Sequence, residues 1–139
     1  MRLAADANVL LSAVLGGRAK TIPYHPKVSE VLTTTLTLDE VQEYAAELAR
    51  KKRLALDAFL MAVATLPLRV TEYGEYERCI PRARALIGKR DPDDVEILAL
   101  ALCSGCILWS NDNDFSGVGV AWHTTAELLA RLRAEGDRA

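Results

Sequence analysis

Cysteine and histidine are scarce in this chain, and their scarcity excludes several kinds of site. The 139 residues include three cysteines and two histidines. Three cysteines are few and odd in number, which predicts a reducing compartment and no disulfide framework. Cys103 and Cys106 have the C-x-x-C spacing, but no second cysteine pair and no paired histidines complete a zinc site. We therefore interpret them as buried residues near a helix end.

The sequence also lacks a long apolar run and an excess of basic charge. The longest apolar run, 97–109, is interrupted by Ser104 and Gly105 and is shorter than the roughly 20 residues of a transmembrane helix. Seventeen Lys and Arg against 19 Asp and Glu give a net charge of −2, so nothing predicts a large basic groove for nucleic acid. A local contact with nucleic acid stays open. We expect a cytoplasmic protein with no membrane segment.

What the sequence does contain is an alternation of short apolar strands and helices. Such alternation predicts an α/β fold, a three-layer α/β/α sandwich whose short, mostly parallel sheet is covered on both faces. No repeat or linker divides the chain, so we predict one domain over 1–134 and a polar tail over 135–139. Helical periodicity turns Tyr44 toward the core. The expected strands are 3–5, 31–35, 68–72, 107–109 and 120–122, and the expected helices are 9–15, 37–53, 56–66, 76–87, 92–104 and 124–133.

The strongest local pattern is a helix followed by a strand in the second half of the chain. Asp91 before Pro92 is typical of a helix start, with Asp at the N-cap and Pro at the first helical position. The helix is apolar nearly all round, which indicates burial, and it ends at Gly105. The run 107–109 then predicts an inner strand.

Acidic residues recur where strands end and helices begin. Asp6 follows the first strand, Glu40 falls in the first turn of a helix, Asp94 opens the central helix and Asp112 follows a later strand. Each has a structural explanation, such as an N-cap at Asp6 and a capping box from Thr37 to Glu40. In a parallel sheet, however, all four would meet at one edge and would raise one another's pKa values. A hard divalent cation such as Mg²⁺ or Mn²⁺ relieves this repulsion.

This pattern resembles the PIN-domain family, small metal-dependent ribonucleases that include the VapC-type toxins. The resemblance spans nearly the whole chain. It rests on Asp6-Ala7-Asn8, on Glu40, on Asp91-Pro92-Asp93-Asp94, and on Ser110-Asn111-Asp112-Asn113-Asp114-Phe115. A short, proline-bearing segment 17–35 differs from many toxins, so the resemblance implies a nuclease more firmly than a toxin.

The resemblance also implies a role for each matching residue. The catalytic set is Asp6, Glu40, Asp94 and Asp112. The residues expected to bind Mg²⁺ or Mn²⁺ are Asp6, Asp94, Asp112 and Asp114. Those expected to support the ligands or position the substrate are Asn8, Ser110 and Asp91. Asp93 is the alternative to Asp94, which we prefer because it shares a helix face with Ile97 and Ala101.

The implied reaction is hydrolysis of RNA phosphodiester bonds, with one or two metal ions and with Glu40 positioning a water. Basic residues that are candidates for holding the RNA backbone are Arg18, Lys20, Lys89 and Arg90. An antitoxin protein and a second copy of the chain, bound through the apolar helices between 38 and 66, are the expected partners.

Two other interpretations stay open. One is an inactive PIN module that binds RNA or a protein partner without cutting. The other is a phosphotransfer domain with Asp6 as nucleophile, which ranks last because Asn8 stands where that class has a second acid.

Overall fold

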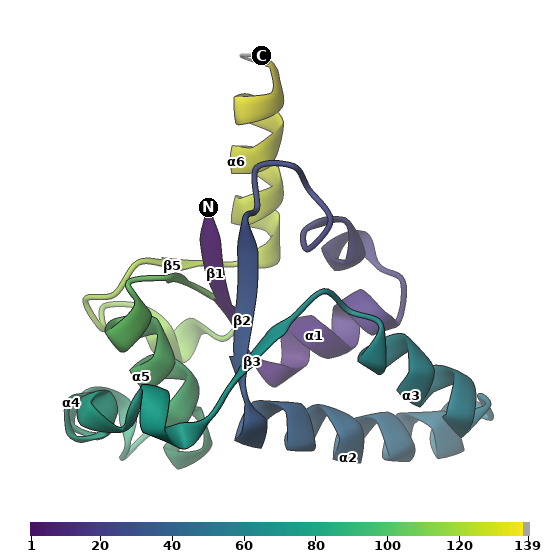
Figure 1. Ribbon diagram of the computed structural model, residues 1–139, viewed down its shortest axis with the longest axis horizontal. Coiled ribbons are helices and arrows are strands. Elements are labelled where there is room, and N and C mark those ends of the chain that lie inside the picture. The colour runs from purple at the N-terminus through teal and green to yellow at the C-terminus, as the bar shows by residue number, and fades with distance from the viewer. Residues whose placement is uncertain (138–139) are drawn as a thin grey trace.

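The computed structural model describes residues 1–137, and its five strands form one sheet in the order β3-β2-β1-β4-β5 (Figure 1). The strands are β1 (Arg2–Ala5), β2 (Glu30–Thr34), β3 (Arg69–Thr71), β4 (Ile107–Trp109) and β5 (Trp122–His123). All four ladders between them are parallel. Central β1 pairs on both sides, with Leu3 opposite Val31 of β2 and Ile107 of β4.

Helices cover both faces of the sheet and complete three layers, which confirms the predicted fold class. The helices are α1 (Ala7–Val14), α2 (Thr35–Lys52), α3 (Leu56–Ala64), α4 (Ile80–Ile87), α5 (Val95–Ser104) and α6 (Thr125–Asp137). In Figure 1, α4 and α5 lie to the left of the strands and α1, α2 and α3 to the right. Alternation along β1 supplies both cores, because Leu3 and Ala5 pack with α1 and α2 whereas Ala4 packs with α5.

Short 3₁₀ helices complete the chain: η1 (Arg18–Thr21), η2 (Tyr73–Glu75), η3 (Glu77–Cys79), η4 (Pro92–Asp94) and η5 (Asn113–Phe115). The strand order reverses at β1, since β2 and β3 lie on one side of it and β4 and β5 on the other. In open α/β sheets, ligands bind beyond the strand C-termini at such a reversal.

The start of α2 differs from the prediction. Thr34, not Thr37, is the N-cap, and its Oγ1 accepts a hydrogen bond of 2.9 Å from the Thr37 backbone N–H. The predicted capping box from Thr37 to Glu40 is therefore wrong, because β2 ends at Thr34 and the helix begins at once. Glu40 lies in the second turn, where no backbone N–H needs its carboxylate.

Three other helices also differ from the prediction. The predicted helices 76–87 and 92–104 are each divided into a 3₁₀ helix and a shorter α-helix, η3 with α4 and η4 with α5, and α6 continues to Asp137, beyond the end predicted at 133. The last two residues of the predicted tail, 138–139, lie outside the described residues, and the division into domain and tail stays a prediction. Among the described residues, no helix has both the length and the apolar character to cross a bilayer.

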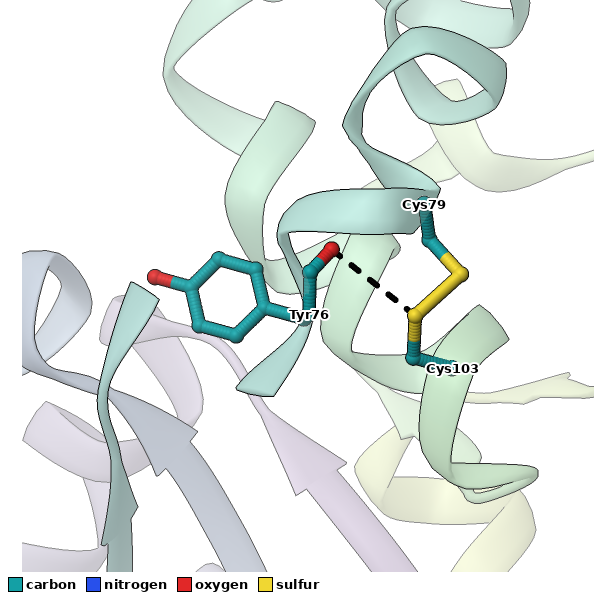
Figure 2. The surroundings of a disulfide bond; sticks show 3 residues. All are labelled: Tyr76, Cys79 and Cys103. Carbon is teal, nitrogen blue, oxygen red and sulfur yellow. Dashed lines mark hydrogen bonds between the residues drawn. A yellow bond between two sulfur atoms is a disulfide. The ribbon is translucent and has the colours of Figure 1, made fainter. Parts of the chain in front are cut away.

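The cysteines correct the prediction of a chain without disulfides. Cys79 in η3 and Cys103 in α5 form a disulfide, with Cα atoms 6.0 Å apart, and Tyr76 lies beside it (Figure 2). Packing of η3 and α4 against α5 brings the two cysteines together, and a sequence separation of 24 gives no sign of this. The C-x-x-C pair is not bonded, since Cys106 is a buried free thiol.

Loss of this disulfide should destabilise the fold. Closing a loop of this length is expected to contribute about 3 kcal/mol by restricting the unfolded chain. We expect Cys79→Ser to lower the free energy of unfolding by roughly 2–4 kcal/mol in denaturant titrations without reductant. With a strong reductant, wild type and variant should converge. Equal stability of the two proteins in oxidising buffer would contradict this prediction.

Candidate metal centre

A cleft of about 130 Å³ lies beyond the C-terminal ends of β1 and β4, and its lining is acidic. The lining residues are Asp6, Ala7, Asn8, Glu40, Tyr44, Asp91, Asp93, Asp94 and Asp112. They come from four separate segments: the end of β1, α2, the η4 turn and the loop after β4. In the part of the chain that the structure describes, no Lys, Arg or His lines this cleft. The structure thus places the whole predicted catalytic set at one sheet edge.

Asp6 follows β1 directly and is buried, with 5% of its surface exposed. Its Oδ1 accepts a hydrogen bond of 3.1 Å from the Val9 backbone N–H and caps α1, while its Oδ2 accepts one from the Ser110 hydroxyl. Burial raises the pKa of Asp6, the two hydrogen bonds lower it, and the charge of Asp112 raises it again. The expected capping role therefore accounts for only one of the two carboxylate oxygens.

The loop after β4 is held by its own hydrogen bonds. The fully buried Ser110 hydroxyl accepts a bond of 3.0 Å from the Asp112 backbone N–H while it donates to Asp6. Asp112 Oδ1 in turn accepts a bond of 2.9 Å from the Asp114 backbone N–H, and Trp122 Nε1 donates to the Ser110 carbonyl at 2.8 Å. Ser110 thus joins the ends of β1 and β4 and fixes the carboxylate of Asp6 relative to Asp112.

The η4 turn and the residue before it supply three carboxylates, those of Asp91, Asp93 and Asp94. Neither Asp91 nor Asp94 makes a side-chain capping bond, so helix capping does not explain why these two acids are there. Burial raises the pKa of Asp94 to about 9, together with a hydrogen bond to Asp91 and the charges of Asp91, Asp6 and Asp112. Asp93 is exposed and instead affects Glu40. Asp94 thus interacts electrostatically with Asp6 and Asp112, whereas Asp93 acts on Glu40, and the choice of Asp94 over Asp93 as a metal ligand stays a prediction.

Glu40 reaches the cleft from α2 and is half-buried. Burial raises its pKa to about 7, and the negative charges of Asp93, Asp91, Glu43 and Asp6 contribute in that order. Three acids of the cleft, Asp6, Glu40 and Asp94, therefore have raised pKa values with a shared cause, which is burial next to other carboxylates.

The donor set fits a hard divalent cation. One carboxylate oxygen each of Asp91, Asp112 and Asp114 lie within 4.8 Å of one another. Oxygen donors without sulfur or imidazole suit Mg²⁺ or Mn²⁺ rather than zinc. Asp112 and Asp114 are two of the predicted metal-binding residues, whereas Asp91 was expected only to support them. Asp6 and Asp94 line the cleft with Asp91 and Asp112 but are not members of this set, and Asp114 belongs to the set without lining the cleft.

Comparison with known protein families identifies the family to which this fold belongs. A family model described as a PIN domain matches residues 5–133. The chain belongs to the PIN-domain family. No curated protein sequence matches this PIN domain.

Several solved structures share the architecture of this PIN domain. VapBC2 from Rickettsia felis, bound to a promoter DNA fragment, is 12% identical with a TM-score of 0.70, covering 89% of this chain and 98% of that one. PAE2754 from Pyrobaculum aerophilum is 20% identical with a TM-score of 0.68, covering 96% and 95%. VapC20 from Mycobacterium tuberculosis, described as a sarcin-ricin loop cleaving toxin, is 19% identical with a TM-score of 0.59, covering 86% and 96%. At these identities the likeness concerns the fold.

One residue of the PIN-domain cleft differs from its sequence-based prediction. Tyr44 was expected in the core but is 47% exposed and lines the cleft. Its position one turn after Glu40 on α2 was the available signal. The four basic residues proposed for RNA contact do not line the cleft itself, and their role stays a prediction; Arg18 lines a separate cavity with Leu129 and Leu132 of α6. Asn8 does line the cleft and is exposed there, as a substrate-positioning residue would need.

Removing the Ser110 hydroxyl should weaken metal binding. In Ser110→Ala, Asp6 loses its hydrogen-bond donor and the Asp112 backbone N–H loses its acceptor. Loss of such a supporting partner costs roughly 10- to 100-fold in metal affinity. We expect that loss in a calorimetric Mn²⁺ titration, with Ser110→Thr closer to wild type because it keeps the hydroxyl. A folded Ser110→Ala protein with unchanged Mn²⁺ affinity would show that Ser110 does not organise the site.

Proposed function

We propose that this PIN domain is a Mg²⁺- or Mn²⁺-dependent endoribonuclease. The observation that carries the proposal is the acidic cleft, where six carboxyl groups from distant segments line one small space without a cationic neighbour among the described residues. Asp91 and Asp94 are not used as caps, and Glu40 has no capping role, so stability of the helices does not explain their positions. Such a cleft is costly unless a cation occupies it.

Each acid has a proposed task in that cleft. Asp6, Asp94, Asp112 and Asp114 would hold the metal, with Asp91 added because its oxygen lies in the closest set. A bound divalent ion supplies charge stabilisation at the phosphate and lowers the pKa of water. Glu40, which reaches the same cleft from α2, would accept a proton from the attacking water. Asn8 would orient a phosphate oxygen through its exposed amide, and Ser110 would position Asp6.

The proposal includes protein partners, and the structural neighbours support it. Structures that share this fold include VapBC2 bound to DNA and a toxin–antitoxin complex from Klebsiella pneumoniae. We infer on that basis that the chain is a VapC-like toxin with a protein antitoxin and that it forms a homodimer. Exposed apolar side chains on α3, Leu56 and Met61, are where a second copy is expected. Light scattering of wild type and Met61→Asp tests the dimer directly.

The first experiment is cleavage of single-stranded and structured RNA by the purified chain with Mg²⁺, with Mn²⁺ or with EDTA. We expect cutting that EDTA stops and that an Asp6→Asn/Asp94→Asn double variant lacks. Equal cutting by that variant would indicate a contaminating nuclease. If no RNA is cut, a calorimetric Mn²⁺ titration separates a metal-loaded nuclease of narrow specificity from the alternative, an inactive module that binds RNA or protein.

A further inference from the structure

A second cavity adjoins the acidic cleft, with the η4 turn as the wall between them. Its volume is about 350 Å³, and its lining includes Tyr73, Ile80, Arg84, Pro92, Val95 and Glu96. Within η4 and the residue before it, Asp91, Asp93 and Asp94 line the acidic cleft, whereas Pro92 lines the second cavity. A polynucleotide whose phosphate lies in the acidic cleft therefore has a neighbouring space for one of its bases.

The walls of this cavity suit a flat ring. Tyr73 is 47% exposed, and its ring packs edge-to-face on Tyr76, with centroids 5.6 Å apart and an interplanar angle of 72°. Ile80 and Val95 add apolar surface from α4 and α5. Exposed aromatic side chains are the usual stacking partners of unpaired RNA bases, contributing about 1–3 kcal/mol per base.

Two charged residues that line the cavity, Glu96 and Arg84, have hydrogen-bonding atoms available to a ligand. Tyr76 is 1% exposed and donates its hydroxyl to Glu96 Oε1 at 2.5 Å, which fixes the Glu96 carboxylate and leaves Oε2 without a donor among the described residues. Arg84 forms no ion pair or side-chain hydrogen bond within residues 1–137, so its guanidinium is available. Gly88 leaves room for it, because a Cβ there would come within 2.9 Å of Arg84 Cγ.

We propose that this cavity binds a guanine base of the RNA next to the phosphate that is cut. The proposal rests on the proposed ribonuclease function. Guanine is the base that matches both groups, because O6 and N7 accept from an arginine while N1–H and the 2-amino group donate to a carboxylate. Adenine would turn an N1 acceptor toward Glu96, and uracil offers one donor between two acceptors. Tyr73 would stack on the base, and Arg84 and Glu96 would select it.

Binding of uncharged nucleosides tests the cavity without the metal and without a phosphate. Guanosine, inosine and adenosine are titrated into the ¹⁵N-labelled full chain, and affinities are taken from chemical-shift changes. A good bidentate pair contributes about 1–3 kcal/mol of discrimination, so guanosine should bind at least about fivefold tighter than adenosine. Inosine, which lacks the 2-amino group, should fall between them.

Variants assign the preference to its residues. Arg84→Gln and Glu96→Gln should each reduce the guanosine preference about fivefold or more, and Tyr73→Leu should weaken all three nucleosides alike. Arg82→Gln is the matched control, because Arg82 is exposed on the same helix and does not line the cavity. Equal affinity for guanosine and adenosine, or the same loss in Arg82→Gln as in Arg84→Gln, would overturn the proposal.

Mapping of cleavage sites separates this inference from the ribonuclease proposal. Wild type should cut a random-sequence RNA with guanine enriched at one fixed position beside the scissile bond, and Arg84→Gln should cut with that enrichment lost. Cutting without any guanine enrichment would overturn the base pocket and leave the nuclease standing. Guanosine binding that depends on Arg84, in a protein that neither cuts RNA nor binds Mn²⁺, would retain the pocket and reject the nuclease.

Discussion

Replacing Asp94 with asparagine is expected to abolish metal-dependent RNA cleavage while raising the melting temperature of the metal-free protein. The variant keeps the size and polarity of the side chain but cannot ionise, so folding no longer requires the uptake of a proton at this position. Burial and the charges of Asp91, Asp6 and Asp112 disfavour the ionised form of Asp94 and raise its pKa to about 9. A neutral amide avoids that repulsion, but it binds a divalent cation far more weakly than a carboxylate does.

The magnitude of the loss can be bounded. Replacing a residue that only supports a metal ligand lowers metal affinity or activity roughly 10- to 100-fold. We therefore expect Asp94→Asn, which replaces a proposed ligand, to lower kcat/KM at least about 100-fold. Thermal unfolding in EDTA, with and without excess Mg²⁺, measures the stability effect. Asp57→Asn is the matched control, because Asp57 is exposed on α3 and lies outside the cleft. A variant that is both less active and less stable in EDTA would mean that Asp94 has a structural role.

Much of the fold follows from local patterns. Apolar runs of three to five residues predicted the strands, and all five were located to within two residues at each end. The start of α2 was harder to predict, because two threonines could each serve as its N-cap. Thr34 and Thr37 are both good N-caps, and only the end of the β2 ladder, where Thr34 pairs with Thr71 of β3, decides between them. Non-local contacts were not predictable, as the pairing of Cys79 with Cys103 shows.

The site was predictable in position but less so in detail. The topology of a parallel sheet was enough to bring Asp6, Glu40, Asp94 and Asp112 to one edge. The arrangement of oxygens within that edge depends on side-chain geometry, so sequence spacing did not reveal that Asp91 has a carboxylate oxygen within 4.8 Å of oxygens of both Asp112 and Asp114. Tyr44 was assigned to the core for a similar reason, since helical periodicity does not distinguish a residue at the rim of a cleft from one beneath it.

The metal-free protein should lose stability as the pH rises from about 5 to 9. A carboxyl group whose pKa is higher in the folded than in the unfolded chain binds more protons when folded. Its contribution is fully present below the unfolded pKa, near 4, and is lost as the pH rises through the folded value. Glu40, with a pKa of about 7, and Asp94, at about 9, place the loss between pH 5 and 9. Glu30 and Glu127 have lowered pKa values, so their opposite effect is complete by pH 5.

Metal binding should reverse this dependence, because a cation must displace the protons of the same carboxyl groups. We expect the melting temperature in EDTA to fall by at least about 5 °C between pH 5 and 9, where 1 kcal/mol corresponds to roughly 3–5 °C. The stabilisation by Mg²⁺ should grow over the same interval, and Asp94→Asn should have a flatter profile in EDTA. A melting temperature that rises with pH in EDTA would mean that these acids are not crowded together in the free protein. The same pair of titrations therefore tests the electrostatic basis of the metal site without any assumption about its RNA.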